Sequence, residues 1–260
     1  MLARRFFLLA AALSAVFPFQ GRAQELPVIA AASDLSFALT NIAAAFKAET
    51  GQEVRLTFGS SGNFTRQILQ RAPFEMFLSA DENFVYQLAD GGRTVDRGEL
   101  YAIGRIVLFV PHGSPVKADA ELADLRAALA DGRMKRLAVA NPEHAPYGRA
   151  AEQALRRHQL WDMARPLLVL GENVSQAAQF AATGSAQAGL FAYSLALSPS
   201  VSERGSYVLL PAEWHEPLRQ RMVLTKEAGP IARQFYAFVQ GDKARAIFRR
   251  YGFALPHDAP

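Results

Sequence analysis

Two serines near the start of the chain stand where a strand should give way to a helix. Ser33 follows an apolar run at residues 28–32, and Ser61 follows an alternating run that ends at Gly59. The first backbone N–H groups of a helix have no acceptor within that helix, and the helix dipole makes that end positive, so anions bind well there. Two such junctions side by side predict an anion-binding cleft that uses hydroxyl and amide donors.

Each serine also has a simpler interpretation. A serine before a helix is most often an N-cap, and for Ser33 taken alone the cap is favoured. Near Ser61, Gly59 and Gly62 favour a ligand, since glycine lets the backbone come close to a bound group. A hydrolase that uses Ser61 or His144 stays as an alternative, although no Gly-x-Ser-x-Gly elbow is present.

The remaining reactive side chains give weaker signals. A metal site needs three or four convergent ligands, and the chain has 5 histidines without an HExxH motif. Tyr147 and Tyr193 both fall in segments near the expected cleft, so a ferric-ion-binding protein is a further alternative. We expect no enzymatic activity and no cofactor.

The expected cleft contains no lysine or arginine at its turns. Arg66 lies one helical turn after Ser61, and Arg149 lies just after Gly148. A site of neutral donors favours a fully deprotonated anion, because a protonated phosphate would present a donor to another donor, at a cost of roughly 1–3 kcal/mol.

Apolar runs alternate with segments of helical periodicity along most of the chain, which predicts an α/β protein with mainly parallel sheets covered on both faces. Strands are expected at residues 28–31, 54–58, 74–78, 105–110, 137–140, 167–170, 188–192, 207–210 and 222–224. Helices are expected at residues 35–50, 64–69, 84–88, 122–131, 149–155, 175–182, 231–239 and 244–251.

Residues 1–23 have the features of a secretory signal peptide, with Arg4 and Arg5 before an apolar run at residues 6–17. Without this segment the net charge is about +1, because three of the 28 basic residues are removed and the 24 acidic residues stay. The basic residues are scattered, which argues against a nucleic-acid partner. The absence of cysteine excludes disulfides.

Two extended crossings, near residues 101–105 and 218–221, predict two lobes joined by a hinge. Lobe 1 would comprise residues 24–104 and 220–260, and lobe 2 would comprise residues 105–219. In such folds the ligand lies at the carboxyl ends of the strands, between the lobes.

Four segments, in this order, make the chain resemble the periplasmic molybdate-binding proteins of ABC transporters. They read Ala-Ala-Ala-Ser-Asp-Leu at 30–35, Phe-Gly-Ser-Ser-Gly at 58–62, Phe-Leu-Ser-Ala-Asp at 77–81 and Asn-Pro-Glu-His-Ala-Pro-Tyr-Gly at 141–148. The resemblance covers nearly the whole chain after residue 23. It implies a type II periplasmic-binding-protein fold that closes around molybdate or tungstate.

The resemblance also implies which residues hold the oxyanion. Ser33 and Ser61 would donate from hydroxyl and amide groups, and Asp34 from its amide with the carboxylate turned away. Tyr147 and Val174 would donate backbone N–H groups. All of these contacts are to the oxygens of the molybdate ion, and none is a bond to the metal itself.

One position departs from the family pattern. Some members supply a tyrosine hydroxyl where this chain has Ala192, and Tyr193 comes one residue later. One step along a strand turns a side chain to the opposite face, so Tyr193 is only a possible contact.

The resemblance implies a monomeric periplasmic protein that delivers its anion to an inner-membrane ABC permease by transient docking. Another tetrahedral oxyanion is the alternative ligand. Sulfate competes more seriously than phosphate, because it too is fully deprotonated.

Overall fold

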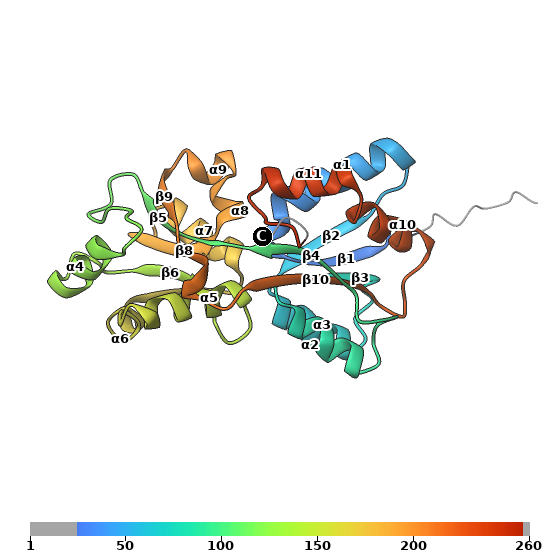
Figure 1. Ribbon diagram of the computed structural model, residues 1–260, viewed down its shortest axis with the longest axis horizontal. Coiled ribbons are helices and arrows are strands. Elements are labelled where there is room, and N and C mark those ends of the chain that lie inside the picture. The colour runs from blue at the N-terminus through green and yellow to red at the C-terminus, as the bar shows by residue number, and fades with distance from the viewer. Residues whose placement is uncertain (1–24, 257–260) are drawn as a thin grey trace, which may run out of the picture.

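Two lobes, each a five-stranded sheet with helices on both faces, lie side by side in the computed structural model, which describes residues 25–256 (Figure 1). The sheet of lobe 1 has the order β2-β1-β3-β10-β4, with β1 at Val28–Ala32, β2 at Arg55–Gly59, β3 at Met76–Ser79, β4 at Glu99–Gly104 and β10 at Leu218–Leu224. The sheet of lobe 2 has the order β7-β6-β8-β5-β9, with β5 at Ile106–Pro111, β6 at Leu137–Ala140, β7 at Leu168–Gly171, β8 at Ala188–Ala192 and β9 at Gly205–Leu209. The predicted two-lobe α/β architecture is confirmed.

Both sheets are mixed, so their parallel content is lower than the sequence pattern predicts. Strand β1 is parallel to β2 and β3, whereas β10 is antiparallel to β3 and β4. In lobe 2, β6 is parallel to β7 and β8, whereas β5 is antiparallel to β8 and β9. The reason is the double crossing: β5 and β10 each enter a lobe from the other one, and so run against the strands that end at the lobe boundary.

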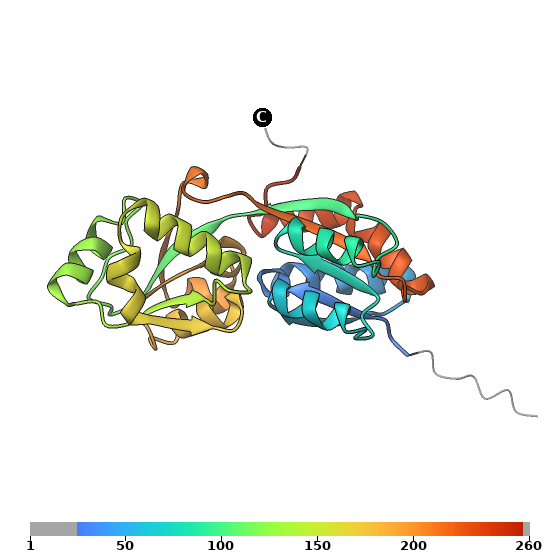
Figure 2. The same cartoon turned by 90° about the horizontal axis from the view of Figure 1, so that it is seen from below.

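Helices cover both faces of each sheet (Figures 1 and 2). In lobe 1 they are α1 at Ser36–Thr50, α2 at Ser61–Leu69, α3 at Glu82–Asp90, α10 at Pro230–Val239 and α11 at Asp242–Arg250. In lobe 2 they are α4 at Ala123–Asp131, α5 at Pro146–Arg157, α6 at Trp161–Ala164, α7 at Val174–Ala182, α8 at Tyr193–Ala196 and α9 at Pro199–Ser202. Short 3-10 turns occupy η1 at Ser33–Leu35, η2 at Arg165–Leu167 and η3 at Ala212–Trp214.

Burial on both faces explains the apolar strands of lobe 1. On one face, Ile29 and Leu78 pack with helices α1, α10 and α11, and on the other Ala30 and Phe77 pack with α2 and α3. A strand covered on both faces has no polar face, so its sequence does not alternate. As predicted, helix α1 ends at Gly51, whose φ of 71° is the left-handed conformation typical of a C-terminal cap.

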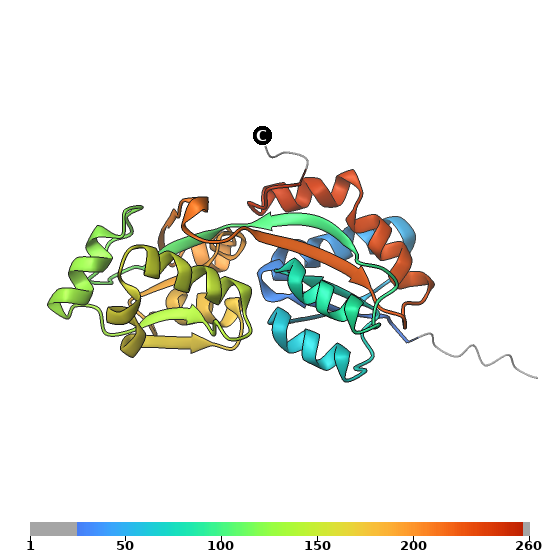
Figure 3. The same ribbon diagram turned by 60° about the horizontal axis from the view of Figure 1, so that its bottom comes forward.

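The two lobes are joined by neighbouring extended segments (Figure 3). Strand β4 runs into β5 with only Arg105 between them, and β10 returns antiparallel beside β4. The sequence pattern marks both crossings but misses β4 as a strand. The predicted signal peptide at residues 1–23 lies outside the described residues. Within residues 25–256, the structure contains no helix long and apolar enough to span a membrane.

Candidate functional site

A small cavity lies between the lobes, at the carboxyl ends of β1, β2 and β3. Across it, lobe 2 contributes the starts of α5 and α7. The lining residues are Ala32, Ser33, Asp34, Gly59, Ser60, Ser61, Ala80, Ala145, Pro146, Tyr147 and Val174. The structure thus brings together all five residues that the sequence proposes as principal oxyanion contacts.

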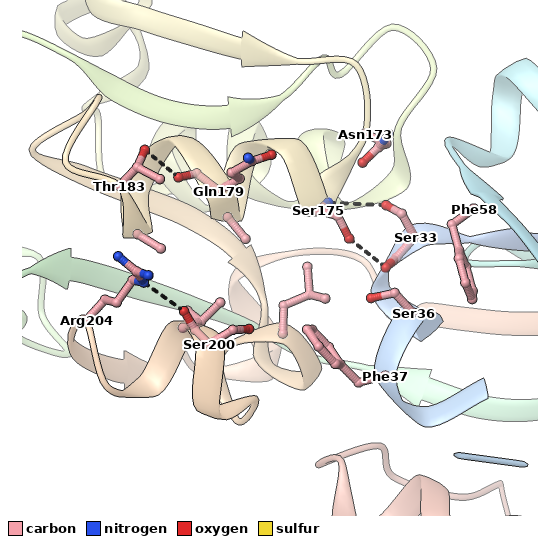
Figure 4. Close-up of a pocket in the computed structure, with 14 residues that line it drawn as sticks. Ser33, Ser36, Phe37, Phe58, Asn173, Ser175, Gln179, Thr183, Ser200 and Arg204 are labelled. Atoms are coloured by element: carbon pink, nitrogen blue, oxygen red, sulfur yellow. Dashed lines mark hydrogen bonds between the residues drawn. The ribbon is translucent and has the colours of Figure 1, made fainter. Parts of the chain in front are cut away.

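Ser33 lies at the lobe boundary, and its hydroxyl does not cap helix α1. Its Oγ accepts a hydrogen bond of 3.2 Å from the Ser175 N–H, and the Ser175 hydroxyl donates to the Ser33 carbonyl at 2.8 Å (Figure 4). Ser33 is the first residue of a 3-10 turn that leads into the helix at Ser36, and that helix has no side-chain cap. The N-cap interpretation is therefore wrong for Ser33.

Ser61 begins helix α2, and its hydroxyl is oriented in the same way. The Ala80 N–H donates to Ser61 Oγ at 3.0 Å. Neither this hydroxyl nor that of Ser33 donates a hydrogen bond within residues 25–256. A serine oxygen that accepts a bond still has its own proton to donate, so both hydroxyls have a proton available for an acceptor in the cavity.

The neighbours of Ser61 contact the other lobe instead. Ser60 Oγ lies 2.9 Å from His144 Nδ1, and the Gly62 N–H donates to the His144 carbonyl at 3.0 Å. His144 Nε2 lies 3.6 Å from a Glu172 carboxylate oxygen. The histidine thus pairs with Ser60 and not with Ser61, and the pair lies buried between the lobes, which disfavours the hydrolase alternative.

Lobe 2 presents helix starts to the cavity. Helix α5 begins with Pro146, which has no N–H, so the Tyr147 N–H is the first donor of the helix. In α7, the Asn173 side chain caps the helix by accepting from the Gln176 N–H and not from that of Val174. Tyr147 and Val174 therefore have helix-start N–H groups at the cavity wall, as the sequence predicts.

Asp34 is the only residue with a carboxyl group among the described residues that line the cavity, and it is 1% exposed. Its Oδ2 accepts from the Tyr147 hydroxyl at 2.9 Å and from Gln220 Nε2 at 2.6 Å, and its Oδ1 is buried without a partner. Burial raises the pKa of Asp34 to about 6, against the lowering effect of these hydrogen bonds. The Tyr101 hydroxyl completes the cluster by donating to Gln220 Oε1 at 2.7 Å.

No lysine or arginine is among the described residues that line the cavity. Arg149 instead forms an ion pair with Asp81 of the other lobe, and Arg66 donates to the Asn63 side chain. The donors that an anion would meet here are therefore neutral groups and positive helix ends, with the buried Asp34 as the one acidic side chain nearby.

Tyr193 does not line the cavity. Its ring lies 5.8 Å from that of Tyr207, and it packs against Gly252. The Tyr147 hydroxyl is engaged by Asp34 and Gln220. The two tyrosines therefore do not form a ferric site, and residues 25–256 contain no group of three or more His, Cys, Asp or Glu side chains suited to a metal ion.

Three polar residues at the lobe boundary were not proposed from the sequence: Ser60, Ser175 and Gln220. The sequence does contain a hint for Gln220, because it lies between Arg219 and Arg221 on the same side of the strand as two apolar residues. The structure buries Gln220 together with these neighbours, Leu218 and Met222. A polar residue on the inward face of a strand needs a partner, and here the partners are Asp34 and Tyr101.

Comparison with known proteins supports the fold and shows the family. The model of the family of bacterial extracellular solute-binding proteins matches residues 27–254. The molybdate-binding protein ModA of Azotobacter vinelandii is 36% identical over 87% of this chain and 89% of its own, and that of Rhodobacter capsulatus is 35% identical over 87% of each. The solved periplasmic molybdate-binding protein of A. vinelandii superposes with a TM-score of 0.79 at 32% identity, covering 88% of this chain and 99% of its own.

Proposed function

Because this chain belongs to the family of bacterial extracellular solute-binding proteins, we propose that it captures molybdate or tungstate in the cavity between its lobes. The observation that carries this proposal is the pair of buried hydroxyls at Ser33 and Ser61. Each accepts an N–H and has its own proton free. Each is also the first residue of a helical turn or helix, next to a positive helix end.

No lysine or arginine is among the described residues that line the cavity, and this favours a ligand that is fully deprotonated. Hydroxyl and amide donors satisfy an oxyanion that carries no proton of its own. Molybdate and tungstate fit this requirement, and relatives at 36% and 35% identity are named as molybdate-binding proteins. Sulfate fits it equally well by charge, so selectivity against sulfate would depend on the size of the cavity.

We propose that the mechanism is closure of two lobes, residues 24–104 with 220–260 and residues 105–219, about the two crossing segments. An anion that bridges Ser33 and Ser61 of one lobe to Tyr147 and Val174 of the other favours the closed state. The closed form, a monomer, would then dock transiently on an inner-membrane ABC permease. This implies export to the periplasm, and it requires no cofactor or enzymatic step.

The test is the melting temperature of residues 24–260 with molybdate, tungstate, sulfate, phosphate or ferric citrate. A ligand at a hundred times its Kd stabilises the folded state by about 2.7 kcal/mol, or roughly 5–10 °C for a chain of this size. A shift with molybdate and tungstate alone supports the proposal. A shift with sulfate or phosphate assigns another oxyanion, and no shift with any anion overturns oxyanion binding.

A further inference from the structure

Asp34 lines the cavity to which we assign an anion, and its buried carboxyl group is turned toward Tyr147 and Gln220. The residue follows Ser33 directly and is fully buried. Its Oδ1 has no partner, and its Oδ2 is held by two neutral donors, the Tyr147 hydroxyl and Gln220 Nε2. A buried, ionised carboxylate beside an oxyanion is an unfavourable arrangement, since two like charges repel strongly where water is excluded.

The groups that face this carboxyl from each neighbouring element offer no compensating charge. Tyr147 faces it from α5, Gln220 from β10 and Tyr101, through Gln220, from β4, while the Ser194 hydroxyl of α8 bonds the Asp34 carbonyl. Burial and the charge of Asp34 hold the pKa of both tyrosines well above the ordinary value, so they stay neutral. No lysine, arginine or histidine forms an ion pair with Asp34 within residues 25–256.

We propose that Asp34 is a proton-binding site coupled to the anion site, so that capture of the oxyanion is accompanied by uptake of one proton by this carboxyl group. The inference rests on the proposed function. A proton on Asp34 removes the like charge next to the cavity and leaves the hydroxyl and amide donors unchanged. By linkage, the anion raises the affinity for the proton as much as the proton raises the affinity for the anion.

Closure of the lobes contributes to the same coupling. The Tyr147 hydroxyl comes from lobe 2, whereas Asp34 belongs to lobe 1, so their contact and the burial of Asp34 depend on the closed arrangement. Opening would let water reach the carboxyl group and restore its ordinary acidity. Release of the anion would therefore also release the proton.

The sign of the pH dependence follows from the pKa of about 6 in the empty, closed structure. Opening lowers this pKa, so anion affinity is independent of pH only below the pKa of Asp34 in the open, empty protein. Above it, binding requires a proton from solution, and the affinity falls with rising pH by up to about tenfold per unit. The fall continues until the pH exceeds the pKa of Asp34 in the complex.

The experiment is isothermal titration of residues 24–260 with molybdate and with tungstate, at several pH values between about 6 and about 8. At each pH, two buffers of different ionisation enthalpy give the number of protons taken up. We expect this number to rise toward one with increasing pH while the affinity falls. Difference infrared spectra should show the carbonyl band of a protonated carboxyl group appearing on binding.

Two variants separate Asp34 from other acids near the cleft. Asp34→Asn keeps the shape and cannot ionise, so we expect it to bind molybdate without proton uptake and with affinity independent of pH. Asp81→Asn removes a carboxylate at the lobe boundary that is already neutralised by Arg149, so the proton count should stay that of the unchanged protein.

The outcomes distinguish this inference from the proposed function. No binding of either oxyanion at any pH overturns the function itself. Binding above pH 7 without proton uptake, or an Asp34→Asn protein that still takes up the proton, overturns only the coupling. If Asp34→Asn does not fold, the proton count and infrared band of the unchanged protein still decide the question.

Discussion

The two lobes approach the cavity with different chemistry. Lobe 1 presents the side-chain hydroxyls of Ser33 and Ser61, each held by a backbone N–H. Lobe 2 presents only helix-start N–H groups, at Tyr147 and Val174. Donors on side chains can be lost by a single substitution, whereas a backbone donor persists with every residue except proline. Binding should therefore be sensitive to side-chain truncation in lobe 1 and tolerant of it in lobe 2.

The largest effect is expected where the lobes touch. A Cβ atom on Gly62 would lie 2.8 Å from the His144 carbonyl oxygen of the other lobe, and the three nearest neighbours all belong to His144. Gly62→Val should therefore hold the lobes apart and weaken molybdate binding on the order of a hundredfold, near the upper end of what overpacking costs. Titration calorimetry measures the loss.

The neighbouring Asn63→Ala is the matched control, since it removes a contact with Glu172 across the lobes but adds no bulk. It should cost at most about 1 kcal/mol. The melting temperature of ligand-free Gly62→Val should stay unchanged, because lobe 1 itself is not overpacked. Normal affinity in Gly62→Val would contradict the closed arrangement as the binding form.

Truncation of the lobe 1 hydroxyls should have the next largest effect. Ser61→Ala and Ser33→Ala each remove one donor to the anion and leave the N–H of Ala80 or Ser175 without its acceptor. A hydrogen bond to a charged group is worth about 1.5–3 kcal/mol, so Kd should rise roughly 10- to 100-fold. If both variants bind normally by calorimetry, the assigned site is wrong.

Tyr147→Phe tests a side chain of lobe 2 that supports closure and still keeps its backbone donor. It removes a hydrogen bond to buried Asp34, worth about 1 kcal/mol, so Kd should rise by about fivefold. The pKa of Asp34 should also rise, because one of the bonds that lowers it is lost. A proton count that stays unchanged across the pH series would contradict this link.

The smallest effect is expected at Val174, where only the backbone is assigned to the ligand. Val174→Ala keeps the N–H and the cap at Asn173, so Kd should change by less than about threefold, or roughly 0.6 kcal/mol. If Val174→Ala weakened molybdate binding as much as Ser61→Ala does, the proposed difference between the two lobes would be wrong. The melting temperature, which falls with lost packing, separates a stability effect from a binding effect.

Much of this arrangement follows from the sequence. The strand β6 is predicted to the residue, and Ser33 and Ser61 stand out from the pattern at the ends of β1 and β2, whereas Tyr147 and Val174 come from the family resemblance. Local pattern suffices for the two serines, because the carboxyl ends of parallel strands meet at one edge of a sheet. The left-handed caps at Gly51 and Gly132 are local signals of the same kind.

What the sequence does not reveal depends on contacts between distant segments. The Ser33 hydroxyl meets Ser175 and not its own helix, because the other lobe supplies a nearby N–H. The carboxylate of Asp34 is turned toward Tyr147 and Gln220, which are 113 and 186 residues away in the chain. Such partners, and the pKa that they and burial produce, require the closed arrangement of both lobes.

The position of β10 has a consequence for the order in which the chain is made. This strand, Leu218–Leu224, lies between β3 and β4 in the sheet of lobe 1, and α10 and α11 complete the core beneath it. Strands β3 and β4 therefore lack the strand that joins them, and the sheet lacks part of its core, until almost the whole chain has emerged from the ribosome. Contacts of such long sequence separation form slowly. For export as proposed above, the late completion of lobe 1 would favour passage of the chain through a secretion channel before this lobe has folded.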